Sequence, residues 1–451
     1  MSVANDLVAA AKDLSALASS SAADAEEQGQ LTDELVEAFH ESGLWAMWMP
    51  TELGGSELAP VPSLEVLEHI SYGDASAGWV LMAAGLATGV DAAFIGDEAA
   101  ADLYGPDGPL IVHSGAGTQP GRAVKADGGY QISGDWRFAS GIKHSGALHT
   151  AAIVEGANEP PRIFVTRVGD MELDDNWDVM GLRATGSIDY TGRDVFVAES
   201  YSYVATTNVP LRGGSLYTMG IAGLGVICHT GWALGVARRI LDELRELAMA
   251  RAGRAGSLAE SSAFHRDYAI AEGKLRGARA FVYEVWSEIE DALGREEQLT
   301  LEQNTLYRLA LQHSTAVAAE VAEFAYAAGG TTALRAGPIQ RCFRDIHAGT
   351  QHMIVSPPVL EGTGRVLAGL VPGHRWLFMS LISDWNRLGV GACSDSGILH
   401  APIRSAGATT GGRRHGRGSG GRLRGWLSHH QGVASPRVRQ SGSGSRGSLL
   451  R

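Results

Sequence analysis

Cysteine is scarce in this chain of 451 residues, and its placement excludes several kinds of stabilised fold. The only three cysteines are Cys228, Cys342 and Cys393. Their wide spacing matches neither a paired-cysteine metal knuckle nor a disulfide framework. Disulfides persist in oxidising compartments and are rare where thiols are kept reduced. The scarcity therefore predicts a reducing compartment, and we expect a cytoplasmic protein.

Signal peptides and membrane helices are also missing from the pattern. The first 28 residues contain Asp6, Lys12 and Asp13, so they lack the basic start and unbroken apolar core of a signal peptide. A membrane helix needs roughly 18 to 20 apolar residues. The nearest candidate, residues 214–236, contains His229, Thr230 and several glycines, which favours a buried helix. We expect a soluble protein with no membrane partner.

Negative charge predominates outside the C-terminal tail. The net charge is -13, yet residues 383–451 hold eleven arginines, no lysine and only two acidic residues, Asp384 and Asp395. An acidic body argues against nucleic acid as the main partner. The tail is rich in Gly, Ser and Arg without apolar periodicity, which predicts disorder from about residue 391. Three interpretations of the tail remain open: a tail without a specific role, a translated frameshift beyond the true domain end, and a tail that binds nucleic acid.

The order of predicted elements is helices, then strands, then helices. This order predicts an α+β fold with an N-terminal helical domain (1–108), a central β domain (109–205) and a C-terminal helical bundle (206–382), followed by the tail (383–451). The final bundle rests on four long, Ala- and Leu-rich segments, 219–250, 261–293, 300–328 and 340–354. Earlier helices are predicted at 31–43, 63–72 and 76–94.

The central region changes to short β-branched runs between Gly, Pro and Asp turns. Asp127-Gly128-Gly129 is a strong hairpin signal. Several strands at short spacing indicate a small antiparallel barrel or sandwich. The predicted strands are 110–113, 122–125, 130–133, 149–155, 162–167 and 188–197.

Two turn-rich segments at strand ends are suited to a planar cofactor. Trp136 and Phe138 lie two residues apart, so on one strand both would point to the same face and form an aromatic wall. Ser140 follows directly and has a hydroxyl for the edge of a ring. Sheet-core aromatics and a turn-forming serine are the alternative interpretations.

The second segment, 181–187, combines glycines that admit close backbone approach with polar side chains. Thr185 and Ser187 supply hydroxyls, and Arg183 is suited to a phosphate or an electron-rich ring edge. A plain inter-strand loop is the alternative. Together the two segments predict a flavin site in the β domain.

Several motifs follow one another in a definite order along the chain, at 74–80, 134–141, 179–187, 194–197 and 338–352. Pro50–Gly55 and Arg344-Asp345 accompany the helix, strand, helix order. The specificity lies in the order and spacing of these motifs over about residues 30–382. On these segments the chain resembles the acyl-CoA dehydrogenase fold and, more closely, its two-component flavin-dependent monooxygenase branch.

The resemblance implies an oxygenase component that uses reduced FMN or FAD from a separate flavin reductase, together with dioxygen, to hydroxylate an aromatic or other small organic substrate. The reaction would pass through a flavin C4a-hydroperoxide. No nicotinamide-binding G-x-G-x-x-G follows a strand, in agreement with reduction elsewhere. Relatives are usually homotetramers, and the resemblance places Arg254 against the flavin of a neighbouring subunit.

His352 is the predicted acid–base or hydroperoxide-stabilising residue, with Ser140 beside the flavin. His347, five residues earlier on the predicted helix, ranks second because it would point to another face. Phenol hydroxylases of this branch often have a further His where this chain has Ala87. The resemblance therefore leaves open a less polar substrate, a polyketide or an amino sugar.

A true acyl-CoA dehydrogenase is the main alternative. Such enzymes remove an α-proton with a carboxylate, and Glu361 in Glu361-Gly362-Thr363 is the candidate base. A flavin-free helical scaffold without activity is the third hypothesis. No HExxH, CxxC, P-loop or GxSxG motif lies at a suitable junction, so no metal site is expected.

Overall fold

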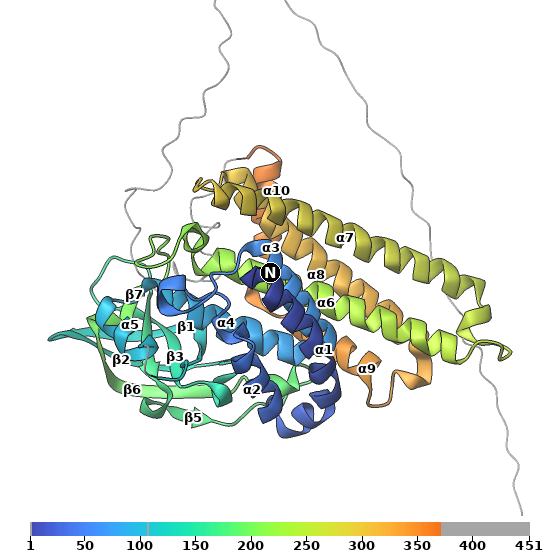
Figure 1. Ribbon diagram of the computed structural model, residues 1–451, viewed down its shortest axis with the longest axis horizontal. Helices are drawn as coiled ribbons and strands as arrows, with labels where there is room; N and C mark the ends of the chain where they lie inside the picture. The colour runs from blue at the N-terminus through green and yellow to red at the C-terminus, as the bar shows by residue number, and fades with distance from the viewer. Residues whose placement is uncertain (1, 106–107, 371–451) are drawn as a thin grey trace, which may run out of the picture. The chain divides into compact units, whose positions relative to one another are not determined.

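The computed structural model describes residues 2–105 and 108–370, and it follows the predicted order of helices, strands and helices (Figure 1). The predicted tail, residues 383–451, lies outside the described residues. The predicted domain boundaries stay predictions, since the described residues belong to one compact unit.

The N-terminal part is helical from α1 (Val3–Gln28) to α5 (Asp97–Tyr104), with α2 (Asp33–Glu41), α3 (Pro60–Gly73) and α4 (Ala75–Phe94) between them. The Asp74 carboxylate caps α4 by accepting from the backbone N–H of Ala77 at 2.9 Å. Helix α4 is almost wholly buried, because it packs on α3 and α6 and on strand β1 (Figure 1). Its position between helices and sheet makes it the centre of the molecule.

The β region is one seven-stranded sheet in the order β5-β6-β2-β1-β3-β4-β7. Five of the six described strand pairings are antiparallel, as predicted, but β1 and β3 are parallel, so the sheet is mixed. The prediction missed two three-residue strands and most of the glycine-rich β1. The strands are β1 (His113–Ala126), β2 (Gly129–Trp136), β3 (Ala147–Val154), β4 (Arg162–Arg167), β5 (Glu172–Asp174), β6 (Asp189–Ala198) and β7 (Ser202–Val204).

The C-terminal part consists of α6 (Gly220–Ala250), α7 (Ser262–Gly294), α8 (Leu301–Gly329), α9 (Pro338–Gly349) and α10 (Pro357–Leu367). Helices α6, α7 and α8 are long and lie side by side (Figure 1), and α9 packs against α6 and α8. Thr300 and Gln303 form a capping box at the start of α8. The predicted helix 340–354 is shorter than expected, because α9 ends at Gly349 and a separate 3-10 turn, Met353–Val355, follows it.

Two apolar cores lie on opposite faces of the sheet. The larger core joins the helices to one face, which includes Ala151 and Ile163, and the smaller core covers the other face, which includes Leu148 and Phe164. Alternate residues of a strand point to opposite faces, so residues 147, 149 and 151 of β3 face the helices. This alternation decides which strand residues reach the interior between sheet and helices.

Among the described residues, α4 and the segment Ser215–Ala250 are long and apolar enough to pass a test for membrane helices. Both are mostly buried by other parts of the fold, at 89% and 83% of the tested window. Burial of this extent is typical of core helices, which explains their apolar composition.

Candidate active site

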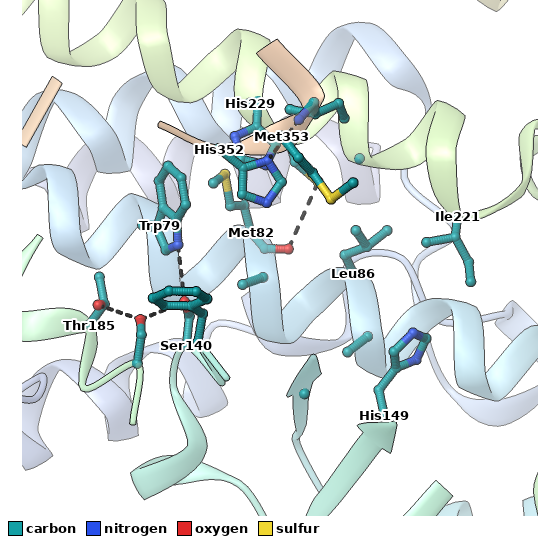
Figure 2. Close-up of a pocket in the computed structure, with 18 of the residues that line it drawn as sticks. Trp79, Met82, Leu86, Ser140, His149, Thr185, Ile221, His229, His352 and Met353 are labelled. Atoms are coloured by element: carbon teal, nitrogen blue, oxygen red, sulfur yellow. Dashed lines mark hydrogen bonds between the residues drawn. The ribbon is translucent and has the colours of Figure 1, made fainter. Parts of the chain in front are cut away.

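A cavity of about 770 Å³ lies between α4, the sheet, the loop 177–187, the start of α6 and the end of α9. Such a volume is within the range of sites that take a cofactor or a small organic ligand. One face of α4 forms its floor, through residues spaced by three or four positions, Trp79, Met82, Ala83, Leu86, Ala87 and Val90. Figure 2 shows the labelled side chains converging on this space.

Three predicted hydroxyls meet on one wall of the cavity. Ser140 and Ser187 lie 2.7 Å apart by their Oγ atoms, and Ser187 Oγ lies 2.6 Å from Thr185 Oγ1. Trp79 donates its indole N–H to Ser140 Oγ at 3.1 Å (Figure 2). The backbone N–H of Gly141 also bonds the Thr185 carbonyl at 2.9 Å, so the two predicted segments are joined directly.

The direction of this hydroxyl chain follows from its end. Thr185 donates its single hydroxyl proton to the Leu182 carbonyl at 2.8 Å, so it must accept from Ser187. Ser187 in turn accepts from Ser140. Ser140 thus donates its proton to Ser187 and accepts from Trp79 with one lone pair, so one lone pair of its oxygen remains. The wall offers an acceptor to the cavity at this point.

Two histidines lie on the opposite side of the cavity from this wall. The rings of His229, on α6, and His352, after α9, are 4.3 Å apart by their centroids. Trp79 contacts both edge-on, at 4.9 Å and 5.7 Å, and thereby links the histidines to the hydroxyl wall (Figure 2). The sequence predicted His352 through the resemblance, but His229 was interpreted only as a buried helix residue.

Both rings are neutral at ordinary pH. Burial lowers the pKa of His352 to about 4, and burial followed by the neighbouring His352 lowers the pKa of His229 well below its usual value. The Nδ1 atom of His352 accepts from the backbone N–H of Ile354 at 3.4 Å, so the neutral ring carries its proton on Nε2. His352 can donate one hydrogen bond without being charged.

The prediction that Trp136 and Phe138 share one face is wrong. Trp136 ends strand β2 and is fully buried in the smaller core, where it stacks on Tyr190 and donates to the Ala151 carbonyl at 2.9 Å. Phe138 lies beyond the strand with φ of 66°, so strand alternation no longer applies. Phe138 lines the cavity, is 60% exposed and meets Trp177 edge-on.

The two predicted arginines lie away from the cavity lining. Arg183 sits in a short 3-10 turn, Arg183–Thr185, whose other residues are buried, and its own side chain is exposed. Arg254 is exposed in the connection between α6 and α7. Arg137, beside Phe138, is the arginine that does line the cavity.

Ala87 lines the floor, as the sequence suggested, and both His347 and His352 line the cavity. The prediction that His347 points elsewhere is wrong, because α9 stops at Gly349 and the chain turns before His352. His149, on β3, is a further lining residue that the sequence analysis did not identify. The alternation along β3 would have been the signal, had the strand register been known.

Carboxylates are absent from the described residues that line the cavity. Glu361 lies on α10 with an exposed side chain and does not line the cavity, so the proposed dehydrogenase base is misplaced for chemistry there. The described residues also contain no cluster of three or more His, Cys, Asp or Glu side chains that could hold a metal ion.

Comparisons with known proteins cover the helical parts and nearly the whole body. Residues 7–106 and 227–357 match the N-terminal and C-terminal domain profiles of acyl-CoA dehydrogenases. Indole-3-acetate monooxygenase of Pseudomonas putida is 30% identical over 360 residues, which is 77% of this chain and 90% of that protein. The flavin-dependent monooxygenase oxygenase subunit HsaA of Rhodococcus jostii is 27% identical over 76% of this chain and 94% of that protein.

Solved structures agree on the fold. The HsaA monooxygenase from M. tuberculosis superposes with a TM-score of 0.77 at 24% identity, over 84% of this chain and all of that chain. XiaF from Streptomyces sp., solved with FADH2, superposes with a TM-score of 0.75 at 21% identity, over 82% of this chain and 96% of that chain. TdsC from Paenibacillus sp., solved with FMN and indole, superposes with a TM-score of 0.68 at 20% identity, over 80% of this chain and 97% of that chain. The predicted fold class is confirmed, and the chain belongs to the flavin-dependent monooxygenases of the acyl-CoA dehydrogenase fold.

Proposed function

We propose that this protein is the oxygenase component of a two-component system that hydroxylates a small aromatic substrate. It would bind reduced FMN or FAD delivered by a separate flavin reductase and use dioxygen as the second substrate. The observation that carries this proposal is the cavity lining, which combines hydroxyls and neutral histidines and has no carboxylate among its described residues. A dehydrogenase of the related type needs a carboxylate base in that place.

The cavity fits a planar flavin ring next to a second, smaller molecule. Phe138 presents an exposed aromatic face at the cavity, and Ser140, Thr185 and Ser187 supply a polar edge. A bound reduced flavin would supply the electrons that activate dioxygen. Arg137 is the cation in reach of an anionic part of the cofactor.

The hydroxyl wall favours the reduced form of the cofactor. Ser140 keeps one lone pair for the cavity, since its proton is engaged by Ser187. A reduced isoalloxazine ring carries an N–H at its reactive edge, whereas the oxidised ring has a bare nitrogen there. An acceptor at this position therefore stabilises the reduced ring more than the oxidised one.

His352 is the residue that we assign to the oxygen chemistry. Its Nε2–H is available to the cavity, because Nδ1 is held by the backbone N–H of Ile354. Burial keeps the ring neutral, so it donates a hydrogen bond without acting as a strong acid. His229 and Trp79 pack around it and exclude water from that side.

The rest of the cavity suits an apolar aromatic body. Leu86, Ile221 and Met353 line it together with small residues on α4, and Ala87 leaves space on the helix floor. Relatives named for indole-3-acetate, and a related structure solved with indole, agree with a substrate of this size. We therefore propose a one- or two-ring aromatic substrate.

Two experiments test the function. Purified protein supplied with reduced FMN or reduced FAD should incorporate one atom of ¹⁸O₂ into indole-3-acetate or indole, as read by mass spectrometry. The competing test is anaerobic, with octanoyl-CoA added to protein that holds oxidised flavin. Bleaching of that flavin without oxygen incorporation in the first test would overturn the proposal in favour of a dehydrogenase.

A homotetramer is proposed as the working assembly. Exposed apolar side chains on the helical part, such as Ile270, Leu360 and Leu367, are available for contacts between subunits. Arg254 lies away from its own chain's cavity lining, so a contact with flavin would have to be made in a neighbouring subunit. Light scattering of the purified protein tests the assembly.

A further inference from the structure

A buried carboxylate with three donors lies next to His149, one of the residues that line the cavity. Asp91, on α4, is fully buried and receives Nδ1 of His113 and Nδ1 of His149, both at 2.7 Å. The hydroxyl of Tyr203 donates to it at 2.7 Å. Burial alone would raise the pKa of Asp91, but the His149 imidazole and hydrogen bonds from both histidines outweigh it and hold the pKa well below its usual value.

A carboxylate buried in this position needs hydrogen-bond donors to stabilise it. Its ion-pair partners among the described residues are His113 and His149. Each ring presents Nδ1 to Asp91, so a proton on each Nδ1 serves the carboxylate. The two rings differ in what surrounds their other nitrogen, Nε2.

The Nε2 atom of His113 has a hydrogen-bond partner inside the protein. The Tyr104 hydroxyl lies 3.1 Å from its Nε2 and donates its own proton to the Thr88 carbonyl at 3.2 Å. His113 is fully buried and does not line the cavity, so its Nε2 is engaged by Tyr104 and closed to a ligand. Burial, followed by the charge of Asp91, raises the pKa of Tyr104 well above its usual value, so this phenol keeps its proton.

His149 is placed differently. It lies on the face of β3 that points to the helices, beside Ala151, and it lines the cavity while being 8% exposed. Its Nδ1–H is held by Asp91, and its Nε2 has no hydrogen-bond partner among the described residues. A proton on Nε2 would have no partner among the described residues, so the atom presents a lone pair to the cavity.

His149 and His352 are well separated along α4. Trp79, which contacts His352, and Asp91, which bonds His149, are twelve residues apart on α4, or about 18 Å along the helix axis. Figure 2 shows His149 on the strand side, away from the His229 and His352 pair. A flat molecule between them meets polar groups at its two ends and apolar side chains over its faces.

From this geometry we infer that His149, oriented by Asp91, is a specificity-determining residue that accepts a hydrogen bond from an N–H or O–H group of the aromatic substrate. The substrate class is thereby narrowed to aromatic rings with a donor at the edge, such as indoles or phenols. This inference rests on the proposed function for the identity of the ligand, but not for the arrangement of the Asp91, His113 and His149 side chains.

Binding of a matched ligand pair tests it without turnover. Indole and benzofuran have nearly the same shape, but only indole carries an N–H. Calorimetry on the full-length protein, with and without oxidised FMN, should show indole binding about tenfold more tightly, as expected for one hydrogen bond in an apolar site. His149→Leu should bring the two affinities within about twofold of each other.

Two further variants guard against a folding artefact. His149→Gln keeps an amide for Asp91 and an acceptor for the cavity, so its discrimination should lie between those of the wild type and His149→Leu. Ile163→Val trims the same wall without touching a polar group and should keep the wild-type ratio. Thermal unfolding of each variant, followed by circular dichroism, reports whether the fold is retained.

The outcomes separate the possibilities. Equal binding of the two ligands to the wild type, or a tenfold preference for indole that persists in His149→Leu, would overturn the inference. A loss in His149→Leu that is larger for indole-3-acetate than for indole would also overturn it, because His149 would then bind a carboxylate. Failure of reduced flavin to bind or to support ¹⁸O incorporation, with the indole preference intact, would instead remove the proposed function.

Discussion

We expect Ser140 to decide which redox form of a flavin this site prefers, and the direction of its hydrogen bonds makes the expectation specific. In Ser140→Ala the cavity loses the one free lone pair of the hydroxyl wall. A net hydrogen bond contributes about 0.5–1.5 kcal/mol, so reduced FMN should bind about threefold to tenfold more weakly. Oxidised FMN, which has no N–H at that edge, should be almost unaffected.

The same variant has a cost to stability. Trp79 donates its buried indole N–H to Ser140 Oγ, and no other acceptor is recorded for it in the described part of the chain. A buried donor left without a partner costs about 1–3 kcal/mol. Ser140→Ala should therefore lower the free energy of unfolding by about that amount, which urea titration can measure.

Ser187→Ala is the matched comparison, since it changes the same chain one link away. Its loss removes the acceptor of the Ser140 proton, so the Ser140 hydroxyl becomes free to donate into the cavity. The preference should then shift toward oxidised FMN. Anaerobic titrations of both forms, read by flavin absorbance or tryptophan quenching, give the ratio of the two dissociation constants. An identical ratio in the wild type and both variants would refute the reasoning.

Three further expectations follow from the site and its supports. His352→Ala should lower the yield of hydroxylated product about 100-fold. Because burial lowers the pKa of His352 to about 4, the wild-type rate should show no ionisation of this group between about pH 6 and 8. Glu361→Gln should leave product yield within about twofold, since the side chain lies outside the cavity lining; a large loss would revive the dehydrogenase alternative. Burial, and then the charge of Asp74, raise the pKa of Asp345 to about 7, so the folded protein holds a proton that the unfolded chain releases above about pH 4. Stability should fall as the pH rises from about 4 to 7, and Asp345→Asn should raise the melting temperature by a few degrees at about pH 8 but not at about pH 5.

Sequence patterns predicted the long helices well because their periodicity is uninterrupted. The predicted segment 261–293 corresponds to α7 (Ser262–Gly294), and 300–328 corresponds to α8 (Leu301–Gly329). Strand β1 was largely missed, since Gly115, Gly117 and Pro120 interrupt its apolar alternation. The parallel pairing of β1 with β3 is a long-range choice that no local pattern specifies.

The site could be predicted where function depends on local turns and not where it depends on packing. Ser140, Thr185 and Ser187 lie in recognisable turn segments, and the structure brings them together. Trp136 was misassigned, because the alternation rule was extended two residues past the end of β2. His149 became visible only once the sheet face covered by α4 was known.

The two halves of the site are held in register by one contact between distant segments. The backbone N–H of Leu182 donates to Asp345 Oδ1 at 2.6 Å, and a side chain at Gly181 would collide with the Arg344 carbonyl, 2.3 Å from the position of its Cβ. The hydroxyl wall is thus attached directly to α9, the helix that leads to His352. Because Thr185 completes its hydroxyl chain at the Leu182 carbonyl, a shift of Leu182 would alter both the Ser140 acceptor and the distance to His352. We therefore expect cofactor binding and oxygen chemistry to be coupled through the backbone at Leu182, so that Gly181→Ala weakens both together in flavin titrations and product yield.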